Sequence, residues 1–173
     1  MVGSTNNLMV SICVIAFNQE HYIIDCLESI INQNTNFDYE LVIGEDCSTD
    51  QTAQLITDFK NKHNNVSLLS NKNNLGVLPN FIRTLKACQG KYLAFCEGDD
   101  YWIDEYKLQK QVDFLELNPE YGGVCGEIIS YDVEEKVENR HSVRSEETIT
   151  FNDLVYQNKI HSNTILFRKE LLS

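Results

Sequence analysis

The chain has 173 residues and a formal net charge of −12, from 26 acidic and 14 basic residues. A surface this acidic repels nucleic-acid phosphates, and no apolar run approaches the roughly 20 residues of a membrane-spanning helix. Hydrophobic residues at 42% and charged residues at 23% are ordinary for one globular domain with a real core, which excludes global disorder.

Strand-like and helix-like patterns alternate from residue 8 to residue 129. The apolar run Met9–Ala16 is rich in β-branched residues, as expected of a strand buried on both faces of a parallel sheet. Four more strands are predicted, at Tyr39–Gly44, Val66–Leu69, Lys91–Cys96 and Gly123–Ile129. Four helices are predicted between the strands: Tyr22–Ile31, one that starts at Ser48 with Gln51 as capping-box partner, one from Pro79 to Gly90, and Tyr106–Leu117.

This order of elements predicts an α/β fold, namely an open, mostly parallel, doubly wound sheet with helices on both faces. We expect residues 1–7 to be a flexible tail and residues 8–130 to form the domain. The charged stretch Tyr131–Glu147 is expected to be a mobile or inserted loop, followed by a helix at Phe151–Tyr156 and a strand at Thr164–Phe167. Because another helix begins just before Ser173, we expect the natural protein to continue.

Polar residues follow three of the predicted strands, in the segments 16–20, 45–48 and 97–102. Ligands of open α/β sheets bind outside the carboxyl ends of the strands, where the strand order reverses. If the first strand lies between the second and fourth, these segments line one crevice. Glu45 and Asp46 have a second interpretation, as a cluster that complements the dipole of the following helix.

Three carboxylates, those of Glu97, Asp99 and Asp100, stand within four residues directly after a buried strand. They repel one another unless a cation offsets their charge, and hard oxygen ligands suit Mg²⁺ or Mn²⁺ bound together with substrate phosphates. Tyr101 and Trp102 follow, either as core aromatics or as a wall on which a sugar or base stacks.

Other chemistry has little support in the sequence. No glycine-rich dinucleotide or P-loop motif and no nucleophile elbow occurs. The six cysteines show no metal-site spacing, and the chain start lacks a secretory signal. We therefore expect six free thiols in a cytoplasmic protein, with contact to the inner face of the membrane only through the acceptor or through chain beyond Ser173.

Five motifs together resemble family 2 glycosyltransferases of the GT-A fold, a nucleotide-binding fold similar to the Rossmann fold. They occur in family order and spacing over roughly residues 8–125, and they read VSICVIAFN (10–18), CLESI (26–30), LVIGEDCSTD (41–50), NLGV (74–77) and GKYLAFCEGDDYW (90–102). The resemblance implies an enzyme of polysaccharide biosynthesis. Such an enzyme moves a sugar from a nucleotide-linked donor, most often UDP-linked, to a glycan or lipid-linked acceptor hydroxyl, with Mn²⁺ or Mg²⁺ and with inversion.

The resemblance also implies site residues. Asp46 would hold the nucleobase edge, Phe17 would pack on the base, and Glu97, first in the family's D-x-D motif, would face the ribose. Asp99 would ligate the metal, with Asp100 beside it. The remaining candidates for donor binding are Ala16, Asn18, Glu20, Asn74, Arg83 and Gly98.

Three departures from the family pattern are visible. Ala16 replaces a usual proline, and Glu97 replaces an aspartate. Where the family often has an Arg-Asn pair after the N-x-G loop, this chain has Phe81-Ile82, with Asn80 and Arg83 alongside. No acid before Ser173 matches the family's catalytic base, so residues 131–173 are expected to begin the acceptor side of the enzyme and the base to lie beyond them. The alternative base within the chain is Asp153.

Rival functions are a sugar-nucleotide nucleotidyltransferase, a receiver-like phosphate-binding domain and a scaffold module. The first lacks a basic glycine-rich loop near residues 16–21, and the second lacks a lysine after a late strand. A scaffold would not need clustered carboxylates in the crevice.

Overall fold

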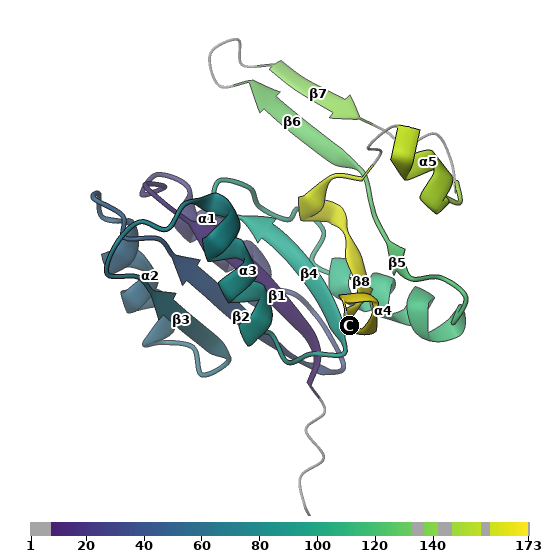
Figure 1. Cartoon of the computed structure of the whole chain (residues 1–173), viewed down its shortest axis with the longest axis horizontal. Coiled ribbons are helices and arrows are strands. Elements are labelled where there is room, and N and C mark those ends of the chain that lie inside the picture. Colours follow the sequence, from purple (N-terminus) through teal and green to yellow (C-terminus); the bar gives the residue numbers. More distant parts are fainter. Residues whose placement is uncertain (1–7, 133–136, 142–146, 157–159, 173) are drawn as a thin grey trace, which may run out of the picture.

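The computed structural model describes residues 8–132, 137–141, 147–156 and 160–172. Four adjacent parallel strands, as predicted, belong to a six-stranded sheet with β3 at one edge, in the order β3-β2-β1-β4-β8-β5 (Figure 1). These strands are β1 (Leu8–Ala16), β2 (Asp38–Glu45), β3 (Val66–Ser70) and β4 (Tyr92–Glu97). The sheet is therefore of the open, mostly parallel type that the sequence predicts.

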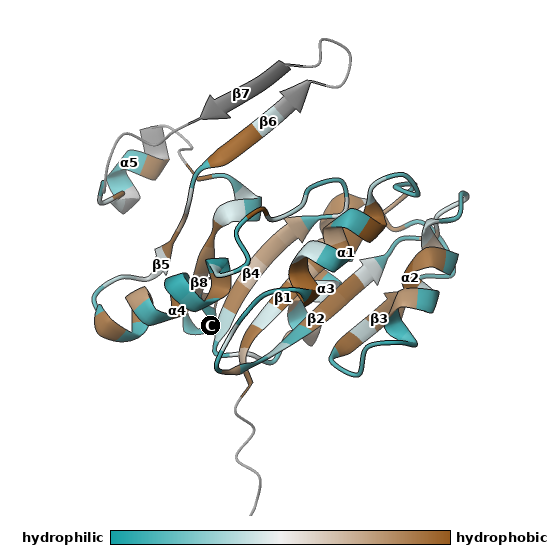
Figure 2. Ribbon diagram, turned by 180° about the vertical axis from the view of Figure 1, so that it is seen from behind, coloured by the Kyte–Doolittle hydropathy of each residue, from teal (hydrophilic) through white to brown (hydrophobic). Residues whose placement is uncertain are grey.

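Helices cover both faces of the sheet, because alternate residues of the central strands point to opposite sides. Val10, Ile12 and Val14 of β1 pack in the larger core. The helices of that core are α1 (Ile23–Ile31), α2 (Thr52–Lys60) and α4 (Lys107–Leu117). Cys13 faces the other way, toward α3 (Val77–Ala87), which lies in front of the sheet in Figure 1. Figure 2 shows the hydrophobic residues concentrated along the central strands.

Two predicted helix starts differ from the structure. The predicted helix start with a capping box at Ser48 and Gln51 is wrong, because α2 begins only at Thr52 and the Gln51 side chain makes no cap hydrogen bond. The backbone N–H of Thr52 instead donates to Asp50 Oδ1 at 2.9 Å. The third helix begins two residues before Pro79, where Gly76 takes the positive φ of +85° that favours glycine.

The predicted fifth strand, Gly123–Ile129, is wrong as one element. Only β5 (Gly123–Val124) joins the sheet, whereas β6 (Ile128–Asp132) pairs with β7 (Val137–His141) in a separate hairpin. The expected loop after Tyr131 is thus partly a strand pair, and its residues 133–136 and 142–146, like the expected tail at 1–7, lie outside the described residues. The hairpin rises on the side of the sheet where β1 and β4 end (Figure 1).

Strand β8 (Leu166–Arg168) occupies the place next to β4 and runs antiparallel to both β4 and β5. Gly123 permits the close approach of β5, because a Cβ atom there would lie 2.9 Å from Phe167 Cβ. The sheet therefore includes a strand from beyond residue 130.

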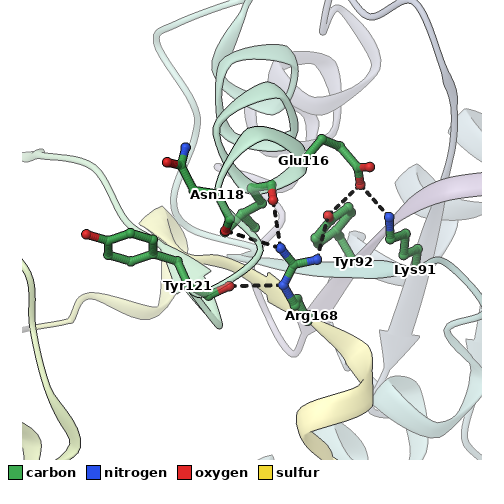
Figure 3. Close-up of polar contacts among 7 residues, drawn as sticks. Lys91, Tyr92, Glu116, Asn118, Tyr121 and Arg168 are labelled. Atoms are coloured by element: carbon green, nitrogen blue, oxygen red, sulfur yellow. Dashed lines mark hydrogen bonds and ion pairs between the residues drawn. The ribbon is translucent and has the colours of Figure 1, made fainter.

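Arg168 explains why β8 sits beside β4 (Figure 3). Its guanidinium donates to the carbonyl oxygens of Leu115 at 2.6 Å and Tyr121 at 2.9 Å, and to the hydroxyl of Tyr92 at 3.0 Å. The Tyr92 hydroxyl donates in turn to Glu116, which also pairs with Lys91. One arginine thus joins β8 to the first residue of β4 and to the last turn of α4.

The chain after the hairpin forms short elements. The helix α5 (Phe151–Tyr156) is confirmed, and the predicted last strand becomes a 3₁₀ turn, η1 (Ser162–Thr164), followed by β8. The helix expected to begin near Ser173 is another 3₁₀ turn, η2 (Lys169–Leu172). Within the described ranges, no helix is both long enough and apolar enough to cross a membrane.

All six cysteines are free, and four of them are buried in the two cores. Cys26 Sγ lies 3.8 Å from Cys96 Sγ, and their hydrogen bond and burial raise the pKa of Cys26 well above its usual value. We expect thiol titration of the denatured, unreduced protein to find six thiols. In the native protein the half-buried Cys47 should react before the four buried thiols. Fewer than six thiols after denaturation would contradict the free-thiol prediction.

Candidate functional site

The carboxyl ends of three strands meet at one edge of the sheet. Strand β1 lies between β2 and β4, as the sequence prediction required, with Ala16 opposite Glu45 and Ile15 opposite Glu97. The loops that follow these strands carry hydrophilic residues at the upper edge in Figure 2. The three predicted polar segments therefore come together as neighbours.

Hydrogen bonds join the loop after β1 to the loop after β2. Asn18, at φ +53°, accepts the backbone N–H of Thr49 at 2.8 Å, and Glu20 accepts that of Gln51 at 2.8 Å. In the other direction, the backbone N–H of Asn18 donates to Ser48 Oγ at 3.1 Å. The side chains of Asn18 and Glu20 thus fix the shape of the edge.

Ala16 ends β1 and Phe17 follows it, and the two side chains have different environments. Ala16 is buried and contributes its carbonyl oxygen, which accepts the backbone N–H of Asp46 at 3.0 Å. The Phe17 side chain is 44% exposed. Phe17 therefore offers an aromatic surface at the edge on which a flat ring could pack.

Glu45 and Asp46 are both only 3% exposed, and their carboxylates bind different loops. Glu45 accepts the N–H groups of Cys47 at 3.2 Å and Ser48 at 2.6 Å, which lie in the loop before α2 and not in the first turn of that helix. Asp46 accepts the N–H groups of Leu75 and Gly76, both at 2.8 Å. It also accepts Asn71 Nδ2 at 2.8 Å, so Asp46 holds the loop between β3 and α3.

Asn74 and Arg83 lie on that loop and on α3. Asn74 Oδ1 accepts the N–H of Gly76 at 2.9 Å, which shapes the loop locally. Arg83 donates to the carbonyl oxygen of Leu69 at 2.6 Å and to that of Ser70 at 3.4 Å, at the end of β3. Its buried Nε has no partner among the described residues. The guanidinium is therefore already engaged in the fold.

The acidic turn after β4 consists of Glu97, Gly98, Asp99 and Asp100. Asp99 is exposed and makes no hydrogen bond within the described part of the chain, whereas Asp100 is half-buried. Burial raises the pKa of Asp100 above its usual value, as do the nearby Asp99 and Glu97 carboxylates, against a hydrogen bond from Asn163 that lowers it. The turn thus presents two exposed residues, Glu97 and Asp99, beside the half-buried Asp100, whose negative charge is disfavoured.

Ser162 and Asn163 complete the acidic turn, and neither residue was predicted from the sequence. Ser162 Oγ donates to Glu97 Oε1 and Asn163 Nδ2 donates to Asp100 Oδ2, each at 2.9 Å. A signal was present, because polar residues directly precede the last predicted strand. When that strand runs antiparallel to β4, its first residues lie beside the last residues of β4.

The sequence left two roles open for Tyr101 and Trp102, and the structure places the two side chains in different environments. Trp102 is 8% exposed, and its indole N–H donates to the carbonyl oxygen of Asn163 at 2.9 Å. Lys107 Nζ lies 4.1 Å from the centre of the Trp102 ring, and burial lowers the pKa of Lys107 to about 8. Tyr101 is 62% exposed. Trp102 is thus a core residue under the acidic turn, and Tyr101 lies on the surface.

A divalent cation fits this turn only in combination with a ligand. Nowhere in the described ranges do three His, Cys, Asp or Glu side chains form a group that could hold a metal ion. Mg²⁺ sites that include substrate phosphates need only one or two carboxylates from the protein. The exposed carboxylate of Asp99, with Asp100 next to it, supplies that number.

Gly98 has a steric reason to be glycine. A Cβ atom at this position would lie 2.2 Å from Gln19 Oε1 and 3.1 Å from Ile23 Cδ1. We expect Gly98→Ala to lower the free energy of unfolding by about 1 kcal/mol, because the flexible end of Gln19 can turn aside but the buried Ile23 must shift to admit the methyl group. Urea denaturation measures the change. The control is Gly126→Ala, whose Cβ would meet nothing within 4 Å and which should change stability by less than about 0.5 kcal/mol. Equal stability of the two variants would contradict the steric argument.

Comparison with known proteins gives consistent results. The sequence profile described as Glycosyl transferase family 2 matches residues 11–172. An uncharacterised protein of Mycobacterium tuberculosis is 34% identical over 163 residues, which are 92% of this chain and 47% of that protein. The chain thus spans about half the length of this curated relative.

Solved structures of glycosyltransferases have the same fold. The crystal structure of residues 1–349 of Staphylococcus aureus TarS superposes with a TM-score of 0.74 at 26% identity, over 95% of this chain and 48% of TarS 1–349. The same TarS fragment has also been solved with UDP and with UDP-GlcNAc. The mannosyltransferase PcManGT of Pyrobaculum calidifontis, solved with GDP-Man and Mn²⁺, has a TM-score of 0.68 at 20% identity over 97% of this chain and 46% of PcManGT. With the profile match over residues 11–172, the chain belongs to glycosyl transferase family 2.

Proposed function

We propose that this chain binds a UDP-linked sugar at the β1–β2–β4 edge for transfer to a glycan or lipid-linked acceptor hydroxyl. The observation that carries the proposal is the exposed carboxylate of Asp99. Asp99 lies just after the end of β4, which pairs with β1, and the half-exposed Phe17 lies just after the end of β1. Family membership favours this function over the nucleotidyltransferase, receiver and scaffold alternatives. TarS, solved with UDP and UDP-GlcNAc, supports a uridine donor by similarity.

In this proposal the nucleobase packs on Phe17 beside Asp46. A carboxylate has about four acceptor positions, and three on Asp46 are used by the loop of residues 71–76. The remaining position on Oδ2 would accept a nucleobase N–H. Glu97 would face the ribose, and the backbone at Ala16, Gly98 and Asn74 would line the donor. Asn18, Glu20 and Arg83 would act indirectly, since their polar atoms already hold the edge in shape.

Asp99 and Asp100 are the residues that would hold Mn²⁺ or Mg²⁺ together with the diphosphate. A diphosphate carries negative charge into a chain of net charge −12, so its binding at an acidic turn needs a compensating cation. When bound, the cation supplies positive charge that stabilises the leaving diphosphate. The contribution of the chain is to hold the two carboxylates at the end of a rigid buried strand, next to the nucleobase site.

Inverting transfer requires a base that activates the acceptor hydroxyl on the face opposite the leaving group. Asp153 is a poor candidate for this role. Its Oδ2 accepts the N–H of Thr150 at 2.8 Å and the Thr150 hydroxyl at 2.6 Å, as in a capping box at the start of α5. We therefore assign no base to the described residues, and the proposal here concerns donor binding.

A thermal-shift panel of nucleotides and nucleotide sugars tests the proposed donor class. A ligand at 100 times its dissociation constant should stabilise the protein by about 2.7 kcal/mol. We expect UDP and at least one UDP-sugar with Mn²⁺ to raise the melting temperature more than GDP, CDP or ADP does. Equal shifts for all four nucleotides, or none for UDP, would contradict the assignment.

A further inference from the structure

The 3₁₀ turn η1 (Ser162–Thr164) makes two side-chain contacts with the acidic turn from a distance of more than 60 residues in sequence. Asn163 Nδ2 donates to Asp100 Oδ2, and Ser162 Oγ donates to Glu97 Oε1. Each bond has a carboxylate acceptor, and such bonds are stronger than neutral ones. Two of the three carboxylates therefore have an orienting donor, and Asp99 has none among the residues that the structure describes.

The turn η1 is itself held firmly, so its side chains reach the carboxylates from a fixed position. The carbonyl oxygen of Asn163 accepts the Trp102 indole N–H, and that of Thr164 accepts Gln111 Nε2 at 2.8 Å. Thr164 and Trp102 are buried. On the far side of η1, Arg168 joins β8 to β4 and α4 (Figure 3).

We infer that Asn163 and Ser162 are positioning residues of the donor site. They fix the carboxylates of Asp100 and Glu97 and so leave Asp99 as the carboxylate exposed to the cation and the diphosphate. The inference rests on the proposed function. It adds residues from beyond the five motifs, and it depends on the antiparallel direction of β8, which brings η1 to the acidic turn.

The test measures the affinity of the whole 173-residue chain for UDP in the presence of Mn²⁺ by calorimetry, with free Mn²⁺ followed by electron paramagnetic resonance. Asn163→Ala should weaken binding about tenfold, the effect of losing one hydrogen bond to a charged group. Asn163→Asp should weaken it further, because the new carboxylate faces that of Asp100. Ser162→Ala, at an exposed position that tolerates substitution, should weaken binding several-fold.

Asn34 provides a matched control. Its exposed amide donates to Glu105 Oε2 at 2.9 Å, the same kind of bond in another part of the chain. Asn34→Ala and Asn34→Asp should leave the Mn²⁺-UDP affinity within twofold of wild type, whatever they do to the melting temperature. If Asn163 had only a structural role, the Asn163 variants would keep the Mn²⁺-UDP affinity of wild type, as the Asn34 variants do.

The outcomes separate the two proposals. If wild type binds no UDP with Mn²⁺, the proposed function fails. If wild type binds and the Asn163 and Ser162 variants bind equally well, the positioning role is overturned. Affinity that falls in the order wild type, Asn163→Ala, Asn163→Asp, with a smaller loss for Ser162→Ala and no loss in the Asn34 variants, supports it. Should Asn163→Ala fail to fold, Ser162→Ala decides alone.

Discussion

Replacing Asp99 with alanine is expected to weaken UDP binding in the presence of Mn²⁺ by about 100-fold, because removing one partner of a close charge pair costs about 2–5 kcal/mol. The melting temperature of the free protein should not fall, since Asp99 is exposed and makes no hydrogen bond in the described part of the chain. We expect it to rise slightly, because Asp99 repels Asp100. Isothermal calorimetry and a thermal melt measure the two effects.

The control for Asp99→Ala is Asp58→Ala, which removes an exposed aspartate from α2. It lowers the net negative charge by the same amount but leaves the acidic turn intact. We expect its UDP affinity to match wild type. If both variants lose affinity equally, or neither does, Asp99 has no specific role in binding.

Replacing Asp46 is expected to damage both stability and donor binding. Asp46→Ala removes the acceptor of three hydrogen bonds. It leaves the N–H of Leu75 without its partner and the N–H of Gly76 with Asn74 Oδ1 alone. The free energy of unfolding should fall by about 2–4 kcal/mol, given that hydrogen bonds to charged groups contribute about 1.5–3 kcal/mol each and water replaces part of the loss. Urea denaturation measures this change.

Asn71→Ala serves as the graded comparison for Asp46→Ala, since it removes only one of the three donors to Asp46. Its cost should be about 1 kcal/mol, and UDP affinity should fall less than in Asp46→Ala. A loss below about 0.5 kcal/mol in Asp46→Ala would show that the carboxylate does not hold the loop of residues 71–76.

The four parallel strands were predictable because short stretches of the sequence are enough to specify each of them. The strands β1 to β4 are apolar runs bounded by polar turns, and amphipathic segments between them give the helices. The position of β8 was not predictable in this way. A three-residue strand has little pattern of its own, and its place depends on contacts of Arg168 with Tyr92 and Leu115, more than 50 residues earlier.

The candidate site was predictable in location but not in detail. Polar residues after β1, β2 and β4 indicated the edge, since carboxyl ends of neighbouring parallel strands meet there. The partners of Asp46 depend on how the loop of residues 71–76 folds back over β2, which no local pattern specifies. Ser162 and Asn163 required the direction of β8 to be known first.

The most direct test of the central claim is calorimetric titration of the wild-type chain with UDP, once in Mn²⁺ and once in a chelator. In the proposed function, the β1–β2–β4 edge binds a uridine diphosphate through a cation held at Asp99. It predicts saturable one-to-one binding in Mn²⁺ and much weaker binding in the chelator, because the acidic turn then repels the diphosphate. Equal affinity under both conditions, or no binding under either, would contradict it.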